Sequence, residues 1–131
     1  MIQHLPAVVA LLTVLLQVGT LWATGKAREK YGIKAPAISG HEGFERAWRV
    51  QMNTLEATVI FLPTLWLATQ YGFPLWGGLA GLVWVFGRVW YAAAYLKDPA
   101  KRGPGFMVAS LGWLVLLVLG VWGLVRAMLV G

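Results

Sequence analysis

Long apolar stretches alternate with short polar segments along this chain, and each stretch has the length of a membrane-crossing helix. Such a helix needs about 20 mostly apolar residues to cross the hydrocarbon core of a bilayer. Four stretches meet this requirement, residues 5–24, 46–71, 75–97 and 105–126, of which the second has a polar beginning. None alternates with a period of two, so the pattern predicts helices and disfavours a barrel. We expect one all-α domain over residues 1–131, an integral membrane four-helix bundle that crosses the bilayer four times.

The composition agrees with a membrane protein and excludes several kinds of site. Hydrophobic residues make up 59% of the 131 residues and charged residues 12%, whereas soluble domains carry roughly 25% charged residues. The chain has no cysteine, which excludes disulfides and cysteine nucleophiles. His4 and His41 lie far apart without ligand spacing, and we expect no metal site. Any thiol chemistry must therefore use a thiol that a substrate brings.

Most basic residues lie in or beside two of the three connections between spans, the first-to-second and the third-to-fourth. Nine of them lie there, namely Lys26, Arg28, Lys30, Lys34, Arg46, Arg49, Lys97, Lys101 and Arg102. Arg126 is the one basic residue expected at the opposite face. This asymmetry predicts charged loops in the cytoplasm and both termini outside. The formal charge of +6 then reflects topology, and its expected partners are membrane lipids rather than nucleic acid.

The beginning of the second span carries an unusual series of polar residues. Steps of three and four place Arg46, Arg49, Asn53 and Glu56 on one helix face. Glu56 lies about 18 Å along the axis from Phe44, well inside the span. A lone carboxylate at that depth is costly, so we expect it to face protein or water and to have a partner.

The third span carries a second polar stripe of Arg88, Tyr91 and Tyr95. Arg49 is a possible partner for Glu56 within its own helix, and Arg88 is a better candidate across an interface. A structural ion pair that only joins helices would also explain Glu56 and Arg88. Interfacial anchoring would likewise explain a single tyrosine. Two arginine-bearing stripes at one membrane face favour a binding pocket instead.

Such a pocket suits an anionic, peptide-like ligand. Arginines bind carboxylates bidentately, Gln51 and Asn53 can pair with amide groups, and Glu56 can accept from an ammonium group. A tripeptide with two carboxylates, one amine and one thiol has these features.

Two runs of this sequence resemble a known family. They are FERAWRVQMNTLE at residues 44–56 and GRVWYAAAYLKDPAKR at residues 87–102. Both are similar to the membrane-associated proteins in eicosanoid and glutathione metabolism (MAPEG), and the second is most similar to the microsomal glutathione transferase branch. The resemblance extends from about Lys26 to the C-terminus.

The resemblance implies a homotrimer that holds glutathione between neighbouring subunits near the cytoplasmic face. Position by position, the residues that match glutathione contacts are Arg28, Arg49, Gln51, Asn53, Glu56, Tyr91 and Tyr95. Arg88 joins them from the polar stripe. Arg102 matches the arginine beside the glutathione sulfur, although Lys101 leaves the exact thiolate partner open.

The implied activity is that of a membrane-bound glutathione transferase with a role in detoxification. Arg102 would stabilise the thiolate, which attacks a lipophilic electrophile entering from the bilayer or reduces a hydroperoxide. Ala57 and Glu29 stand where the leukotriene C4 synthase branch has a tyrosine and a second arginine. Both differences argue against leukotriene synthesis.

Two other classes of function are open to this sequence. One is a non-catalytic family member that serves as a lipid-binding or scaffold protein, against which the presence of Asn53, Glu56 and Arg102 argues. The other is a small four-helix drug exporter. Exporters of that kind carry an essential carboxylate in their first span, where Gln17 is the most polar interior residue here.

Overall fold

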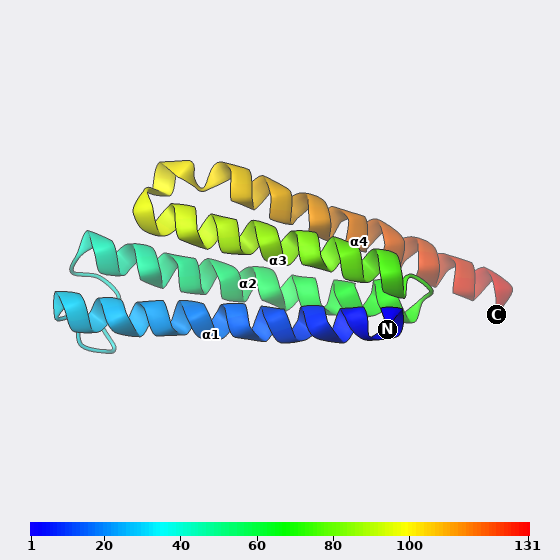
Figure 1. Ribbon diagram of the computed structural model, residues 1–131, viewed down its shortest axis with the longest axis horizontal. Coiled ribbons are helices and arrows are strands. Elements are labelled where there is room, and N and C mark those ends of the chain that lie inside the picture. Colours follow the sequence, from blue (N-terminus) through cyan, green and yellow to red (C-terminus); the bar gives the residue numbers. More distant parts are fainter.

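The computed structural model describes residues 1–131 as four long helices with short connections and no β-strand. The elements in order are η1 (Ile2–His4), α1 (Leu5–Tyr31), α2 (Glu42–Gln70), α3 (Pro74–Lys97), η2 (Pro99–Lys101) and α4 (Gly103–Val130). The four long helices lie side by side, with the α1–α2 loop and the α3–α4 link at one end of the bundle (Figure 1). The predicted all-α four-helix bundle is confirmed.

Local sequence explains where the helices begin and end. α1 ends at Gly32, whose positive φ of 66° favours glycine as a C-cap. α2 begins after His41, whose Nδ1 accepts a hydrogen bond from the amide of Gly43 at 2.9 Å. α3 begins at Pro74, a residue that lacks an amide hydrogen and is therefore favoured at the first positions of a helix. Asp98 ends α3 and caps η2 through the amide of Ala100, 3.0 Å away.

Three of the four helices are long and apolar enough to cross a membrane. They are Ile2–Tyr31, Pro74–Lys97 and Pro99–Val130, where the first and third include the short 3-10 helices. α2 has 29 residues, but the polar series in its first half lowers its hydropathy. Because α2 runs beside the other three (Figure 1), its crossing of the bilayer stays a prediction that rests on its place in the bundle.

The core lies where all four helices meet. Phe61 of α2 and Trp84 of α3 stack with ring centres 3.7 Å apart, and Val9, Leu65 and Leu116 surround them. Most other large apolar side chains lie on the outer surface, where a soluble protein would present polar groups. The bundle therefore has a small shared core and an apolar exterior suited to lipid.

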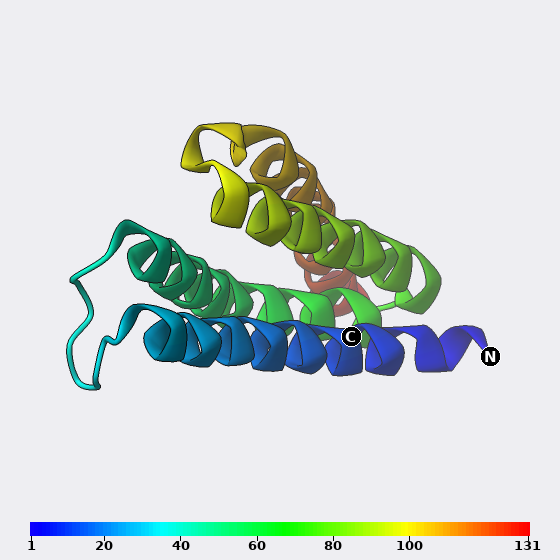
Figure 2. The same cartoon turned by 60° about the vertical axis from the view of Figure 1, so that its left-hand side comes forward.

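Glycines bring α3 and α4 into close contact. Gly87 faces the backbone of Ala109, and Gly105 faces the backbone of Tyr91, so closely that neither position has room for a methyl group. A Cβ at Gly112 would lie 2.8 Å from a backbone atom of α3. Small residues permit such backbone approach between membrane helices. Figure 2 shows the resulting α3–α4 hairpin inclined to the α1–α2 pair.

Candidate functional site

A cleft of about 780 Å³ opens between α2, α3 and the beginning of α4. It lies toward the end of the bundle that holds the α3–α4 link. Its walls combine charged or polar side chains with apolar ones. The lining residues are Asn53, Glu56, Ala57 and Ile60 of α2, Arg88 and Tyr91 of α3, and Ala100, Arg102, Gly103 and Phe106 of the link and α4.

A hydrogen-bonded network forms the inner wall of the cleft. Arg88 is only 3% exposed, and its Nη2 donates to Oγ1 of Thr54 at 3.2 Å. Its guanidinium carbon lies 4.1 Å from the ring centre of Tyr91, a cation–π distance. The Tyr91 hydroxyl accepts from Nδ2 of Asn53 at 2.8 Å. The amide of Asn53 is thereby oriented with its nitrogen toward the tyrosine, which leaves its carbonyl oxygen to accept from a ligand.

Glu56 lines the same cleft but forms no ion pair with Arg88 or Arg49. Within the chain, the expected pairing of Glu56 is therefore wrong. The reason is that the guanidinium of Arg88 is turned toward Thr54 and Tyr91. Glu56 is an exposed carboxylate at the edge of the cleft, and its acceptor oxygens are unused.

The link between α3 and α4 places Arg102 at the opposite wall. Nη1 of Arg102 donates to the carbonyl oxygen of Pro99 at 2.7 Å, which orients the guanidinium. Lys101 is exposed and does not line the cleft. The end of α3, next to this link, is also tied to α2, since Nη1 of Arg46 donates to the carbonyl oxygen of Lys97 at 3.3 Å. Of the two neighbouring cations, Arg102 is the one that faces the cleft.

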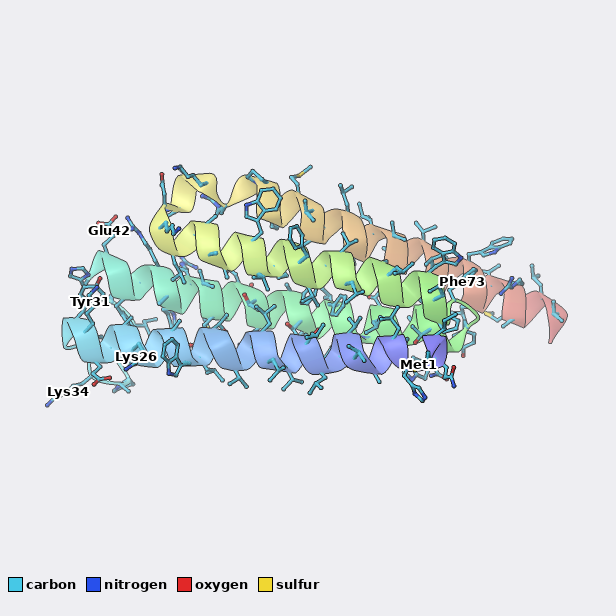
Figure 3. All side chains as sticks on the ribbon, viewed as in Figure 1. Met1, Lys26, Tyr31, Lys34, Glu42 and Phe73 are labelled. Atoms are coloured by element: carbon cyan, nitrogen blue, oxygen red, sulfur yellow. The ribbon has the colours of Figure 1, made fainter.

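Arg28, near the end of α1, binds the α1–α2 loop and does not line the cleft. Its Nη1 donates to the carbonyl oxygen of Ala37 at 2.7 Å, and the guanidinium lies 4.7 Å from the ring centre of Phe44. It anchors the α1–α2 loop, whose end of the bundle is marked by Lys34 and Glu42 in Figure 3.

The other three expected contacts also lie outside the cleft of a single chain. Arg49 is exposed on α2 and Gln51 is half-buried. Tyr95 lies one turn beyond Tyr91, with ring centres 5.6 Å apart. The structure thus brings together five of the nine predicted site residues, namely Asn53, Glu56, Arg88, Tyr91 and Arg102.

Several residues of the site were not expected from the sequence, among them Thr54, Ile60 and Phe106. Thr54 holds Arg88, and Ile60 and Phe106 supply apolar walls. Steps of three and four from Ala47 and Val50 place Thr54 on the inward face of α2, and this periodicity is the signal that could have found it. The residues contain no group of three or more His, Asp or Glu placed to hold a metal ion. The polar groups that line the site are guanidinium, carboxylate, amide and phenol groups.

Comparison with known proteins identifies the relatives of this chain. Residues 6–122 match the model of the MAPEG family. Microsomal glutathione S-transferase 2 of Homo sapiens is 42% identical over 106 residues, which cover 80% of this chain and 71% of that protein. Leukotriene C4 synthase of Cavia porcellus is 37% identical over 119 residues, covering 90% and 79%. An uncharacterised Synechocystis protein is 42% identical over 113 residues, covering 86% and 82%.

Proposed function

This chain belongs to the MAPEG family, and on that premise we propose that it is a membrane-bound glutathione transferase. It binds glutathione in the cleft, activates the thiol as thiolate and directs it to lipophilic electrophiles. Reduction of hydroperoxides by the same thiolate is part of the proposal, as is a role in detoxification. The observation that carries it is the cleft itself, where cationic, amide and carboxylate groups meet apolar walls.

The polar groups of the cleft complement those of glutathione. Glu56 has free acceptor oxygens for the ammonium group, and Asn53 has a free carbonyl oxygen for a peptide amide. Arg88 is buried with no anionic partner, and its Nε has no hydrogen-bond partner at all. A buried cation without a counter-charge is costly. An anionic ligand that reaches this wall of the cleft relieves that cost.

The thiol is activated by the other cation of the cleft, Arg102. A free thiol has a pKa of about 8.5, so only a few per cent is thiolate at neutral pH. A nearby guanidinium favours the charged form and lowers the thiol pKa. The thiol proton leaves to water, and the sulfur lone pair forms the new bond to carbon while the electrophile's leaving group departs with the electrons of the broken bond.

The second substrate meets the apolar part of the cleft. Ala57, Ile60 and Phe106 line this part, and both Ile60 and Phe106 are exposed on the outer surface of the chain. A lipophilic electrophile dissolved in the bilayer therefore has an apolar route from lipid to the sulfur. This adjacency of a polar and an apolar wall supports a transferase that draws on membrane-soluble substrates.

We also propose that the active unit is a homotrimer with glutathione at the contact between subunits. Arg49 and Glu56 are exposed on one face of α2, which also presents exposed Leu55 and Val59. An exposed carboxylate inside a bilayer is costly unless protein or water covers it. A neighbouring copy that covers this face would bring Arg28, Gln51 or Tyr95 of either subunit within reach of the same ligand.

The proposed topology has four crossings, with the cleft near the cytoplasmic face. The α1–α2 loop and the α3–α4 link lie at the same end of the bundle (Figure 1), and the nine basic residues in or near these two connections lie toward this end. The positive-inside rule supports a cytoplasmic position for it. Glutathione from the cytoplasm would then reach the cleft directly.

Turnover distinguishes this proposal from a non-catalytic scaffold. Purified protein is incubated with glutathione and a panel of lipophilic electrophiles and hydroperoxides, and conjugates and oxidised glutathione are measured by mass spectrometry. We expect product above the uncatalysed rate, with loss in Asn53→Ala and no loss in Lys34→Gln, whose side chain is exposed on the α1–α2 loop. Saturable binding without any product would identify a scaffold. The absence of both binding and product would refute the assignment.

A further inference from the structure

A second polar cavity lies at the opposite end of the bundle from the cleft. It has a volume of about 380 Å³ and is formed by the end of α2, the turn to α3 and the end of α4. Its lining residues are Gln70, Tyr71, Gly72, Gly123, Arg126, Ala127 and Val130. The glutathione chemistry proposed above uses none of these residues.

Arg126 is the one cation of this cavity, and its hydrogen-bond donors are unused. Four of the chain's six arginines donate hydrogen bonds within the chain, namely Arg28, Arg46, Arg88 and Arg102. Arg126 donates none, and no carboxylate lies within 4.0 Å of it. Its guanidinium lies 5.3 Å from the ring centre of Phe73 and against Gly72, where a Cβ would come 2.6 Å from Nη2. The guanidinium is thus held over the α2–α3 turn with free donors.

The position of Arg126 along α4 corresponds to the headgroup level of a bilayer. Twenty residues of helix span about 30 Å, the thickness of the hydrocarbon core. Counted from Gly105, where the predicted fourth span begins, this length ends at Val125, and Arg126 is the next residue, at the edge of the hydrocarbon core. Trp76 and Trp122 are exposed near this end, as expected for an interfacial belt. In Figure 1 the end of α4 projects past the other helices, and Figure 3 shows Phe73 at this same end of the bundle.

We propose that this cavity binds the phosphate group of an anionic phospholipid in the leaflet opposite the glutathione cleft. A guanidinium binds two phosphate oxygens at once, and Gln70 and Tyr71, which also line the cavity, carry neutral donor groups.

The charge of the cavity selects an anionic rather than a zwitterionic lipid. Its lining includes no carboxylate, and the five acidic residues of the chain all lie elsewhere, at Glu29, Glu42, Glu45, Glu56 and Asp98. The ammonium group of a zwitterionic headgroup would therefore find no acidic side chain in this cavity. A net-negative headgroup gains the guanidinium contact and brings no ammonium group that needs a partner.

A single fluorescent label can test this site, because the chain has no native cysteine. Met128 is 73% exposed and does not line the cavity, so Met128→Cys carries a fluorophore beside it. The full-length protein is placed in phosphatidylcholine nanodiscs that contain spin-labelled phosphatidylglycerol or spin-labelled phosphatidylcholine. We expect the anionic lipid to associate about fivefold more strongly, as one interfacial cation predicts.

Two variants and inorganic phosphate decide the outcome. Arg126→Gln should abolish the preference for phosphatidylglycerol, whereas Arg126→Lys should keep part of it. Lys34→Gln, an exposed cation at the other end, should leave it unchanged. Equal quenching by both lipids in the wild-type protein, or a preference that survives Arg126→Gln, would overturn the proposal. Inorganic phosphate is also tested alone against the protein in phosphatidylcholine nanodiscs, and phosphate binding that depends on Arg126 without any preference for phosphatidylglycerol would mean a free-anion site and would overturn the proposal.

Discussion

Replacement of Arg102 by leucine tests the activation of the thiol. The guanidinium of Arg102 lines the cleft and is oriented by its 2.7 Å bond to the carbonyl oxygen of Pro99, but it is exposed in a single chain. Nearby cations lower the pKa of an acid by about one to three units. Solvent screening of an exposed group favours the lower end, so we expect a shift of about one unit. Each unit corresponds to about 1.4 kcal/mol, or tenfold in thiolate fraction when the pKa lies above the working pH.

Arg102→Leu should therefore retain glutathione binding and lose about tenfold in turnover at neutral pH. Without the cation, the pKa of the bound thiol rises toward about 8.5, so the turnover of the variant recovers as the pH rises past that value. Ultraviolet absorbance of the bound thiolate, titrated against pH, measures the shift directly. Lys101→Leu is the matched control, since Lys101 is the adjacent exposed cation outside the cleft. An unchanged titration in Arg102→Leu, or an equal shift in the control, would refute this role of Arg102.

Three further predictions concern the inner wall, the helix packing and the topology. Thr54→Val removes the hydrogen bond from the buried guanidinium of Arg88 and should cost about 1.5–3 kcal/mol, seen as a lower thermal unfolding midpoint; an unchanged midpoint would contradict it. Gly87→Ala places a methyl group against the α4 backbone and should destabilise the protein by about 1–3 kcal/mol in the same assay, unless α3 and α4 are not packed as described. Single cysteines at Ser39 and Ala100 should react with an impermeant thiol reagent from the cytoplasmic side alone, and labelling of both from outside would reverse the topology.

The fold was predictable because its signals are long and local. Four apolar stretches of membrane-spanning length left few alternatives to a helical bundle. The predicted spans are shorter than the helices, since α1 continues seven residues past Thr24 to Tyr31. Hydropathy detects the lipid-facing length of a helix, whereas the helix itself continues until a residue such as Gly32 ends it.

The site was predictable where helix periodicity governs it. Asn53 and Glu56 on α2, and Arg88 and Tyr91 on α3, are spaced by three residues and reach one cleft. Which groups bond to one another was not predictable. Arg88 bonds to Thr54, 34 residues away, because the relative rotation of α2 and α3 and the side-chain rotamers decide the nearest acceptor.

Loop geometry explains why Arg28, an expected ligand contact, lies outside the cleft of a single chain. Its donors are taken by the carbonyl oxygen of Ala37, and no periodic pattern predicts the path of residues 32–41. The sequence shows that a cation stands at the end of the first span. The fold decides that, in a single chain, this cation anchors a loop.

Equilibrium binding of glutathione to the purified, assembled protein tests the central claim most directly. Wild-type protein, Glu56→Gln and the control Lys34→Gln are compared by calorimetry, with the thermal midpoint of each confirming its fold. The cleft predicts saturable binding to the wild type and the control, and about tenfold or greater weakening in Glu56→Gln, because the ligand ammonium loses a charge-assisted partner worth about 1.5–3 kcal/mol. Absence of saturable binding, or equal affinity in a folded Glu56→Gln variant, would contradict glutathione recognition by this cleft.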